Sequence, residues 1–151
     1  MKAFNNLNEI LDFAIGEEQA AVDFYLLLAD QSTNIQSKKI FLEYAGEEIR
    51  HKSKLMNIKE MNQFHLSDEV VRDLKITEYL VDVSPSANMS YQDALILAMK
   101  KEKAAFRMYM ALADNAEDQS VKAIFLNLAQ EESKHKLRFE LEYDEYILTE
   151  N

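Results

Sequence analysis

The chain has 151 residues, a length typical of one domain, and 48% of them are hydrophobic, which suffices for a sizeable core. It contains no cysteine, which excludes disulfides, cysteine-ligated metal clusters and thiol catalysis within the chain. The net charge of −10 disfavours nucleic acids and anionic membranes as partners, because both are bound by clustered lysine and arginine.

Four long helices are predicted from the spacing of apolar residues and from the scarcity of turn formers, with only two glycines and one proline. They span about residues 7–30, 36–62, 90–115 and 119–146. Asn6 and Glu9 have the spacing of a capping box at the start of the first helix. Ser90 and Asp93 repeat this spacing at the start of the third. We therefore expect an all-α protein.

Short polar turns join the first helix to the second and the third to the fourth. Each pair is therefore expected to be an antiparallel hairpin, at about residues 7–62 and 90–146. The prediction is a single domain of residues 1–151 that consists of two antiparallel helical hairpins packed as a four-helix bundle.

A long connection of about residues 63–89 lies between the hairpins and contains Pro85, the only proline. Residues 67–80 within it have room for a short helix. A segment of this length can pass from one end of the bundle to the other, since a helix of 25 residues is about 37 Å long. The connection is therefore predicted to be a crossover.

The two hairpins repeat the same chemical residues 84 positions apart. The matching pairs are Glu18 and Glu102, Tyr25 and Tyr109, Glu48 and Glu132, and His51 and His135. In each half, a single glutamate precedes a Glu-x-x-His by 30 residues. Residues three apart share a helix face, so the glutamate and histidine of one motif can approach the same metal ions. Four glutamates and two histidines at these spacings predict a two-metal site, with half of the ligands from each hairpin.

The predicted ligands lie on apolar helix faces. The residues three, four and seven positions from Glu18 are all apolar or aromatic and include Leu11, Ala14, Ala21, Val22 and Tyr25. An isolated buried carboxylate would give up its charge, and four in one core would repel each other. Two divalent cations would balance four carboxylates, which favours the metal site over a metal-free core.

Other polar residues lie close to the predicted ligands. Glu17, Glu47 and Glu131 are each one residue from a ligand, which is about 100° around the helix, so we expect them on the rim or facing solvent. Tyr25 and Tyr109 follow Glu18 and Glu102 by two turns. Their hydroxyls can hydrogen-bond to ligand carboxylates across the bundle, although plain core packing explains them equally well.

At these positions the chain resembles the rubrerythrin-like branch of the ferritin-like superfamily, across both hairpins. The resemblance implies a ferritin-like bundle with two iron ions per chain, although manganese shares these hard ligands. Rubrerythrins typically carry an additional glutamate one turn after the third-helix ligand, where this chain has Ala105, so its symmetric set of six ligands is more similar to that of bacterioferritin. Rubrerythrins also usually carry a cysteine-ligated rubredoxin domain. This chain lacks that domain, so its electrons would come from a separate donor, such as a rubredoxin-like protein.

Three functions fit this pattern. The first is a non-haem di-iron oxidoreductase that reduces hydrogen peroxide or dioxygen, as a rubrerythrin-like peroxidase or ferroxidase. The second is an iron-binding or storage protein without turnover, and the third is a structural bundle with a vestigial metal site. The first is the expected function, and the small alanines near the site, Ala21, Ala105 and Ala129, leave room for a small oxidant but disfavour a large organic substrate. A homodimer is expected, and a cytoplasmic location is expected because no segment has the pattern of a signal peptide or a membrane span.

Overall fold

The computed structural model describes residues 4–62, 64–81, 83–86 and 88–150. Within them the chain is helical, without a strand, which confirms the all-α prediction. The elements are α1 (Leu7–Gln31), α2 (Ile35–Glu60), α3 (Asp68–Leu74), the 3-10 helix η1 (Ile76–Tyr79), α4 (Tyr91–Asp114) and α5 (Gln119–Glu150). The predicted domain also includes residues 1–3 and 151, and the predicted crossover includes residues 63, 82 and 87, all of which lie outside the described residues.

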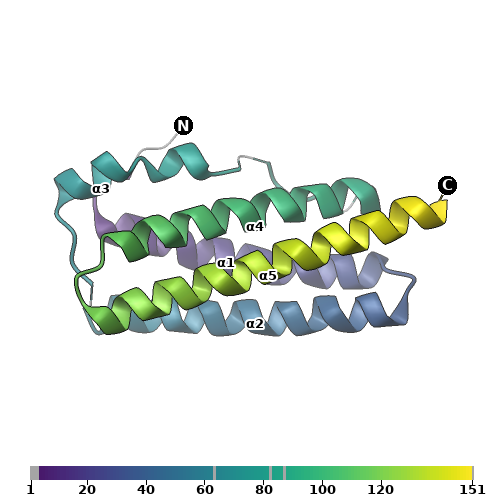
Figure 1. Cartoon of the computed structure of the whole chain (residues 1–151), viewed down its shortest axis with the longest axis horizontal. Helices are drawn as coiled ribbons and strands as arrows, with labels where there is room; N and C mark the ends of the chain where they lie inside the picture. The colour runs from purple at the N-terminus through teal and green to yellow at the C-terminus, as the bar shows by residue number, and fades with distance from the viewer. Residues whose placement is uncertain (1–3, 63, 82, 87, 151) are drawn as a thin grey trace.

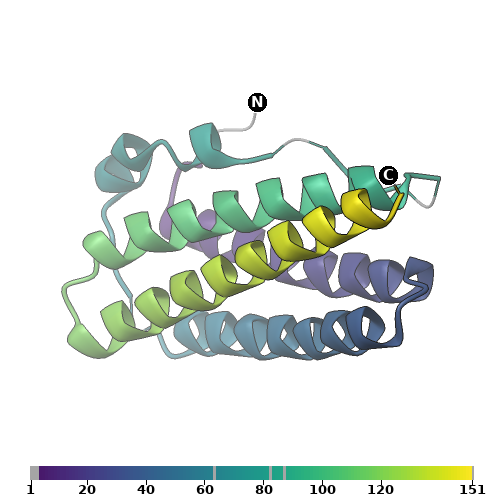
Figure 2. The same ribbon diagram turned by 45° about the vertical axis from the view of Figure 1, so that its right-hand side comes forward.

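The four long helices form a bundle of two antiparallel hairpins, with α1 packed along α2 and α4 along α5 (Figure 1). The crossover carries α3 and η1 along the α4 side of the bundle, away from α2, in both views (Figure 2). This arrangement confirms the predicted ferritin-like bundle with one long crossover. No helix in the described part of the chain is long and apolar enough to cross a membrane. That the whole chain forms one domain stays a prediction.

Side-chain caps fix the starts of the helices. The side chain of Asn6 accepts a hydrogen bond from the Glu9 amide at 3.0 Å. The Glu9 carboxylate accepts from the amide of Asn5 at 2.8 Å, one residue earlier than a capping box requires. The Ser90 hydroxyl accepts from the Asp93 amide at 3.1 Å. The structure adds a cap that the sequence analysis missed, Asn34 at the start of α2.

The observed helix ends lie within two residues of the predicted ones, except that α5 continues to Glu150 rather than ending near residue 146. No glycine or proline follows Tyr146, so nothing in the sequence stops the helix there.

The apolar core is divided into two clusters by a polar layer at the middle of the bundle. One cluster contains Leu11, Leu55, Leu112 and Phe125, and side chains of the crossover pack against it. The other, at the opposite end, contains the fully buried rings of Phe41 and Phe139. The residues that lie between the two clusters in all four helices are the predicted metal ligands.

The cap of α2 gives a prediction for stability. Asn34 accepts hydrogen bonds from the amides of Gln36 (2.8 Å) and Ser37 (3.3 Å). Replacing it by alanine leaves both amides without this acceptor, so Asn34→Ala should lower the free energy of unfolding by about 1 kcal/mol, whereas Asn34→Gly should cost only a few tenths. Urea denaturation of the two variants measures the difference. Equal losses would show that the cap does not stabilise this helix.

Candidate metal centre

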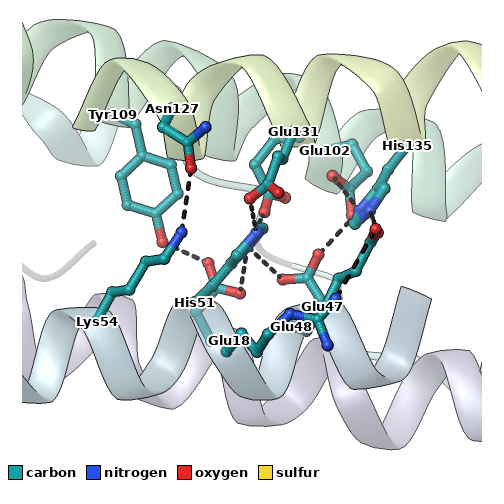
Figure 3. A network of polar contacts seen from close by, with 12 residues as sticks. Glu18, Glu47, Glu48, His51, Lys54, Glu102, Tyr109, Asn127, Glu131 and His135 are labelled. Carbon is teal, nitrogen blue, oxygen red and sulfur yellow. Dashed lines mark hydrogen bonds and ion pairs between the residues drawn. The ribbon is translucent and has the colours of Figure 1, made fainter. Parts of the chain in front are cut away.

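The six predicted ligands come together in the polar layer at the centre of the bundle (Figure 3). Each is only 1–3% exposed. They are Glu18 from α1, Glu48 and His51 from α2, Glu102 from α4, and Glu132 and His135 from α5. Burial of four carboxylates and two imidazoles in an apolar bundle is costly unless they are paired or bind cations.

The Nδ1 atoms of both imidazoles point into the carboxylates. Nδ1 of His51 lies 2.7 Å from Oε1 of Glu132, and 3.4 and 3.5 Å from oxygens of Glu48 and Glu18. Nδ1 of His135 lies 2.9 Å from Oε1 of Glu48 and 3.7 Å from Oε2 of Glu102. Nδ1 of each histidine therefore lies closest to the motif glutamate of the opposite helix, which preserves the symmetry of the sequence repeat.

The Nε2 atoms point outward to two glutamates that the sequence analysis placed on the rim or in solvent. Nε2 of His51 lies 2.5 Å from Oε2 of Glu131, and Nε2 of His135 lies 2.5 Å from Oε2 of Glu47. The side chains of Glu47 and Glu131 are 21% and 30% exposed, so they lie at the rim but do not point into solvent. A proton on Nε2, held by these carboxylates, leaves Nδ1 of a neutral imidazole free to bind a metal.

Glu17 differs from these two glutamates. Its side chain is 44% exposed and lies 3.8 Å from the ammonium of Lys101, which confirms its predicted place on the surface. The contacts of Glu47 and Glu131 cross from one helix to the other. They depend on how α2 and α5 face each other, which the spacing within either helix does not show.

Most of the atoms that a metal would bind have no hydrogen bond. Among the buried side-chain atoms that the structure describes, at least one carboxylate oxygen of each of the four glutamates and Nδ1 of both histidines make no hydrogen bond. The two Nδ1 atoms lie 2.7 and 2.9 Å from carboxylate oxygens, but these contacts are ion pairs only when the imidazoles are protonated. Buried polar atoms are almost always paired in folded proteins. Ligand atoms of these residues lie within 4.8 Å of one another in two groups, one of Glu18, Glu48, His51 and Glu132 and one of Glu48, Glu102, Glu132 and His135. Hard carboxylate oxygens with imidazole suit iron or manganese, so the residues fit a pair of metal ions.

The pKa values show the electrostatic cost of the cluster without metal. Burial, reinforced by the charges of neighbouring carboxylates, raises the pKa of Glu48 and of Glu132 well above the usual range. Burial and the charge of Glu18 raise the pKa of Glu102 to about 8. Burial acts to lower the pKa of His51, but the surrounding carboxylates outweigh it and raise this pKa. Metal binding requires ionised carboxylates and neutral imidazoles, so it must release protons here.

Glu18 titrates in the opposite sense. Burial acts to raise its pKa, but contacts with Glu48, His51 and the Tyr109 hydroxyl together lower it. Tyr109 donates a hydrogen bond to Oε1 of Glu18 from across the bundle. In the described part of the chain, Tyr25 makes no matching hydrogen bond to Glu102, and its ring instead packs against Phe139 with centroids 5.2 Å apart. The two predicted tyrosine positions are thus not equivalent.

Tyr44 contacts the site in a way that the sequence analysis missed. Its ring stacks on the imidazole of His135, with centroids 3.9 Å apart and an angle of 24° between the planes. Burial and the charge of Glu47 raise the pKa of Tyr44 to about 12, so the phenol stays protonated. The residue 84 positions later is Leu128. A comparison of the two halves of the sequence could have revealed this difference, because position 44 has an aromatic side chain and position 128 has an aliphatic one.

Two cavities adjoin the cluster from opposite sides. One of about 60 Å³ lies between α1 and α4, reaches Glu18 and Glu102, and is lined by small alanines and by crossover residues. The other, of about 220 Å³, lies between α2 and α5 and is lined by Tyr44, Glu47, Glu131 and His135 among others. The first is the size of a few water molecules and can admit only a small molecule.

The raised pKa of Glu102 predicts how the stability of the metal-free protein depends on pH. The folded state holds this proton up to about pH 8, whereas the unfolded state releases it near 4.5. The folded state therefore binds more protons between these values, and stability must fall as the pH rises, with a limiting slope of about 1.4 kcal/mol per pH unit for this one group. The raised pKa values of Glu48, Glu132 and both histidines act in the same sense.

Thermal unfolding of the chelator-treated protein between pH 5.5 and 8 tests this dependence. Glu102→Gln should flatten it, while Glu17→Gln, which removes one exposed charge, should leave it unchanged. A midpoint that rises with pH in the unmodified protein would contradict the assignment.

A model of the family described as Rubrerythrin matches residues 9–143, which include most of both hairpins and all six clustered residues. No significant match is found among curated proteins or among solved structures. The buried carboxylate and histidine cluster, together with this match, indicates a metal-binding site. The chain belongs to the rubrerythrin family.

Proposed function

We propose that the chain is a non-haem di-iron oxidoreductase that reduces hydrogen peroxide or dioxygen with electrons from a separate donor. The observation that carries this proposal is the set of buried carboxylate and imidazole atoms without hydrogen-bond partners, which converge in two groups. A structural bundle would gain nothing from such atoms, because replacing buried charges by apolar side chains is often neutral or stabilising.

The two groups define which residues would hold the ions. Glu18 and His51 belong to the first group only, and Glu102 and His135 to the second only, while Glu48 and Glu132 are shared. When bound, a pair of ferrous ions supplies the two electrons that cleave the O–O bond of peroxide. The chain itself fixes the imidazoles through Glu47 and Glu131, and the Tyr109 hydroxyl holds Glu18 in place.

The α1–α4 cavity favours a small oxidant. Its lining includes Ala20, Ala21, Ala104 and Ala105, and its volume of about 60 Å³ leaves no space for a large organic substrate. Leu80, Val81 and Pro85 of the crossover line it as well, so the segment that joins the hairpins limits the access of solvent. Ala105 occupies the position of the extra rubrerythrin glutamate, so the space that a seventh ligand would fill belongs to this cavity.

The opposite side of the cluster suits the electron donor. The chain has no cysteine and cannot hold an iron–sulfur centre of its own. Tyr44, stacked on His135, lines the α2–α5 cavity and is the aromatic side chain that connects this imidazole to the surface. We assign the donor, such as a rubredoxin-like protein, to this side, which leaves the α1–α4 cavity free for the oxidant.

Iron oxidation is a second candidate, with ferrous iron as the substrate. It is favoured by the α2–α5 cavity, because three glutamates, Glu43, Glu47 and Glu131, line it next to His135 and can attract a cation. Aerobic addition of excess ferrous iron distinguishes the two candidates. Turnover beyond the iron that fills the site supports ferroxidase activity, whereas a single stoichiometric oxidation supports the reduction of peroxide.

The outward contacts of the histidines give a prediction for metal affinity. Glu131→Gln removes the charge that polarises His51, so it should weaken binding of the ion held with His51 by roughly 10- to 100-fold. Anaerobic competition titration with ferrous iron and a chromophoric chelator measures the affinity. Glu17→Gln is the matched control, since it removes a glutamate that also precedes a ligand but contacts no histidine. Equal affinities in the two variants would show that Glu131 does not support the ligand.

The reaction with peroxide tests the proposed function. Protein loaded anaerobically with ferrous iron, checked by elemental analysis for about two ions per chain, is mixed with hydrogen peroxide in a stopped-flow instrument. The iron should be oxidised much faster than free ferrous iron at the same pH. Glu48→Ala, which removes a residue shared by both groups, should lose both ions and the fast phase while remaining helical. A rate no faster than that of free iron would refute peroxide reduction.

A further inference from the structure

A third cavity lies at the end of the bundle where the α1–α2 turn meets the start of α4 and the last turns of α5, near the C-terminal end in Figure 1. Its volume is about 360 Å³, larger than either cavity at the metal centre and within the range of cavities that bind small molecules. Every described residue that lines it has a polar group in its side chain, and none of the six clustered residues is among them. The function proposed above therefore leaves this cavity without a role.

A buried carboxylate lines the cavity. Glu142 of α5 is only 6% exposed. The hydroxyl of Ser37, itself 1% exposed on α2, donates to this carboxylate, with 2.7 Å between Oγ and Oε2. The Arg138 guanidinium is less close, with Nη2 3.8 Å from Oε1. Since a hydroxyl has one proton and a carboxylate has about four acceptor sites, Glu142 can accept further hydrogen bonds from a molecule in the cavity.

The internal repeat shows that the bundle does not need polar side chains at these positions. The 84-residue offset pairs three of them with residues of the apolar cluster at the other end, namely Ser37 with Val121, Glu142 with Ile58, and Tyr91 with Leu7. The same fold thus closes its other end with apolar contacts. Replacing a buried ion pair by apolar side chains is often neutral or stabilising. We therefore expect the polar groups around the cavity to serve binding and not packing.

Two further buried polar atoms at the cavity lack a partner. The side-chain nitrogen of Gln31 donates to the Met89 carbonyl at 3.2 Å, which fixes the orientation of the amide and leaves Oε1 buried without a hydrogen bond. The buried hydroxyl of Tyr91 makes no hydrogen bond either. Burial and the charge of Glu142 raise the pKa of Tyr91 against the effect of the nearby Ser32, so this hydroxyl keeps its proton. Buried polar atoms are almost always paired, so a ligand is expected to supply the partner of Gln31.

The charges and rings around the cavity favour a cation. Glu142 and Glu145 lie three residues apart on α5 and share a helix face, and no lysine or arginine is among the described residues that line the cavity. The ring of Tyr146 packs at 62° against that of Tyr91, with centroids 5.3 Å apart. Tyrosine rings attract ammonium groups through their faces. Two carboxylates, an amide oxygen and two rings together accept hydrogen bonds and positive charge.

A metal ion fits this cavity less well than an organic cation. In the described part of the chain, groups of at least three carboxylate or histidine side chains that are close enough to share an ion occur only in the central cluster. The volume of about 360 Å³ also greatly exceeds the space of about 30 Å³ that one water molecule occupies. The occupant is therefore expected to have a carbon skeleton.

We propose that this cavity binds a small aliphatic diamine in its ammonium form. One ammonium group donates to the buried carboxylate of Glu142 and to Oε1 of Gln31. The carbon chain lies against the rings of Tyr91 and Tyr146. The second ammonium group faces Glu145, whose side chain is exposed. This inference does not depend on the proposed function, because the cavity and the metal centre share no residue.

Calorimetric titration of the full chain with putrescine, a four-carbon diamine, tests the proposal at physiological ionic strength. The titration should show saturable binding of about one molecule per chain, whereas the uncharged diol of the same length should not bind. Absence of saturable binding, or equal binding of the diol, would overturn the proposal. Binding of calcium or magnesium in place of putrescine would also overturn it, because the cavity would then hold a metal ion.

Three single variants locate the binding. Glu142→Gln should weaken putrescine binding by roughly 10- to 100-fold, as expected for the loss of a hydrogen bond to a charged group. Glu145→Gln should weaken it as well and cannot disturb the core, because Glu145 is exposed. Glu43→Gln is the matched control, since it removes an exposed glutamate beside the α2–α5 cavity and should leave the affinity unchanged. Equal affinities in the three variants would show that putrescine binds only to the overall negative charge.

A double variant separates binding from stability. Ser37→Val combined with Glu142→Ile gives this end of the bundle the residues of the other end. The variant should keep or raise the urea midpoint of unfolding and should no longer bind putrescine. A large fall in the midpoint would show that the Ser37–Glu142 contact is needed for folding, and unchanged binding would show that the carboxylate does not hold the ligand. Either result would contradict the proposal.

Discussion

The structure depends on the burial of four carboxylates and two imidazoles in the middle of an apolar bundle. Such groups are among the most expensive to remove from water, and mutual repulsion adds to the cost. Without metal, the cluster reduces this cost by holding protons, which is why the pKa values of Glu48, Glu102 and Glu132 are raised. Two cations would replace those protons. The affinity of the site for metal and the instability of the metal-free core are thus two consequences of the same arrangement.

This constraint organises the rest of the bundle. The two apolar clusters lie on either side of the polar layer and supply the hydrophobic stabilisation that the layer does not. The crossover packs Val71 and Ile76 onto one cluster and then lines the α1–α4 cavity with Leu80 and Val81. A connection that only joined the two hairpins could be shorter and polar. Here it contributes both to the core and to the enclosure of the site.

The sequence predicted the elements of this design that repeat and the hydrogen bond of Tyr109 across the bundle, but it missed the contacts of Glu47 and Glu131 with histidines of the opposite helix. Helical periodicity and the 84-residue offset suffice to place Glu18 and Glu102 in the core, because both signals lie within single helices. Glu17 and Glu47 show where this reasoning ends. Each precedes a ligand glutamate, yet Glu47 contacts His135 of α5 while Glu17 lies near Lys101 on the surface. That difference depends on how each helix is rotated about its own axis relative to its neighbour, and the spacing of residues within one helix does not determine this rotation.

The positions at which the two hairpins differ are informative, because the hairpins have the same fold and the same residues at the buried cluster. The six clustered positions are identical in the two halves of the chain, and each group of candidate ligands takes residues from both hairpins. Tyr44 against Leu128, and Tyr109 with its hydrogen bond against Tyr25 without one, make the surroundings of the two histidines different. The outer faces of the two hairpins differ as well, since Gly46 and Ile49 of α2 correspond to Gln130 and Ser133 of α5. Burial in an apolar bundle constrains the six polar positions at its centre, and the hairpins differ around these positions and on the outer faces.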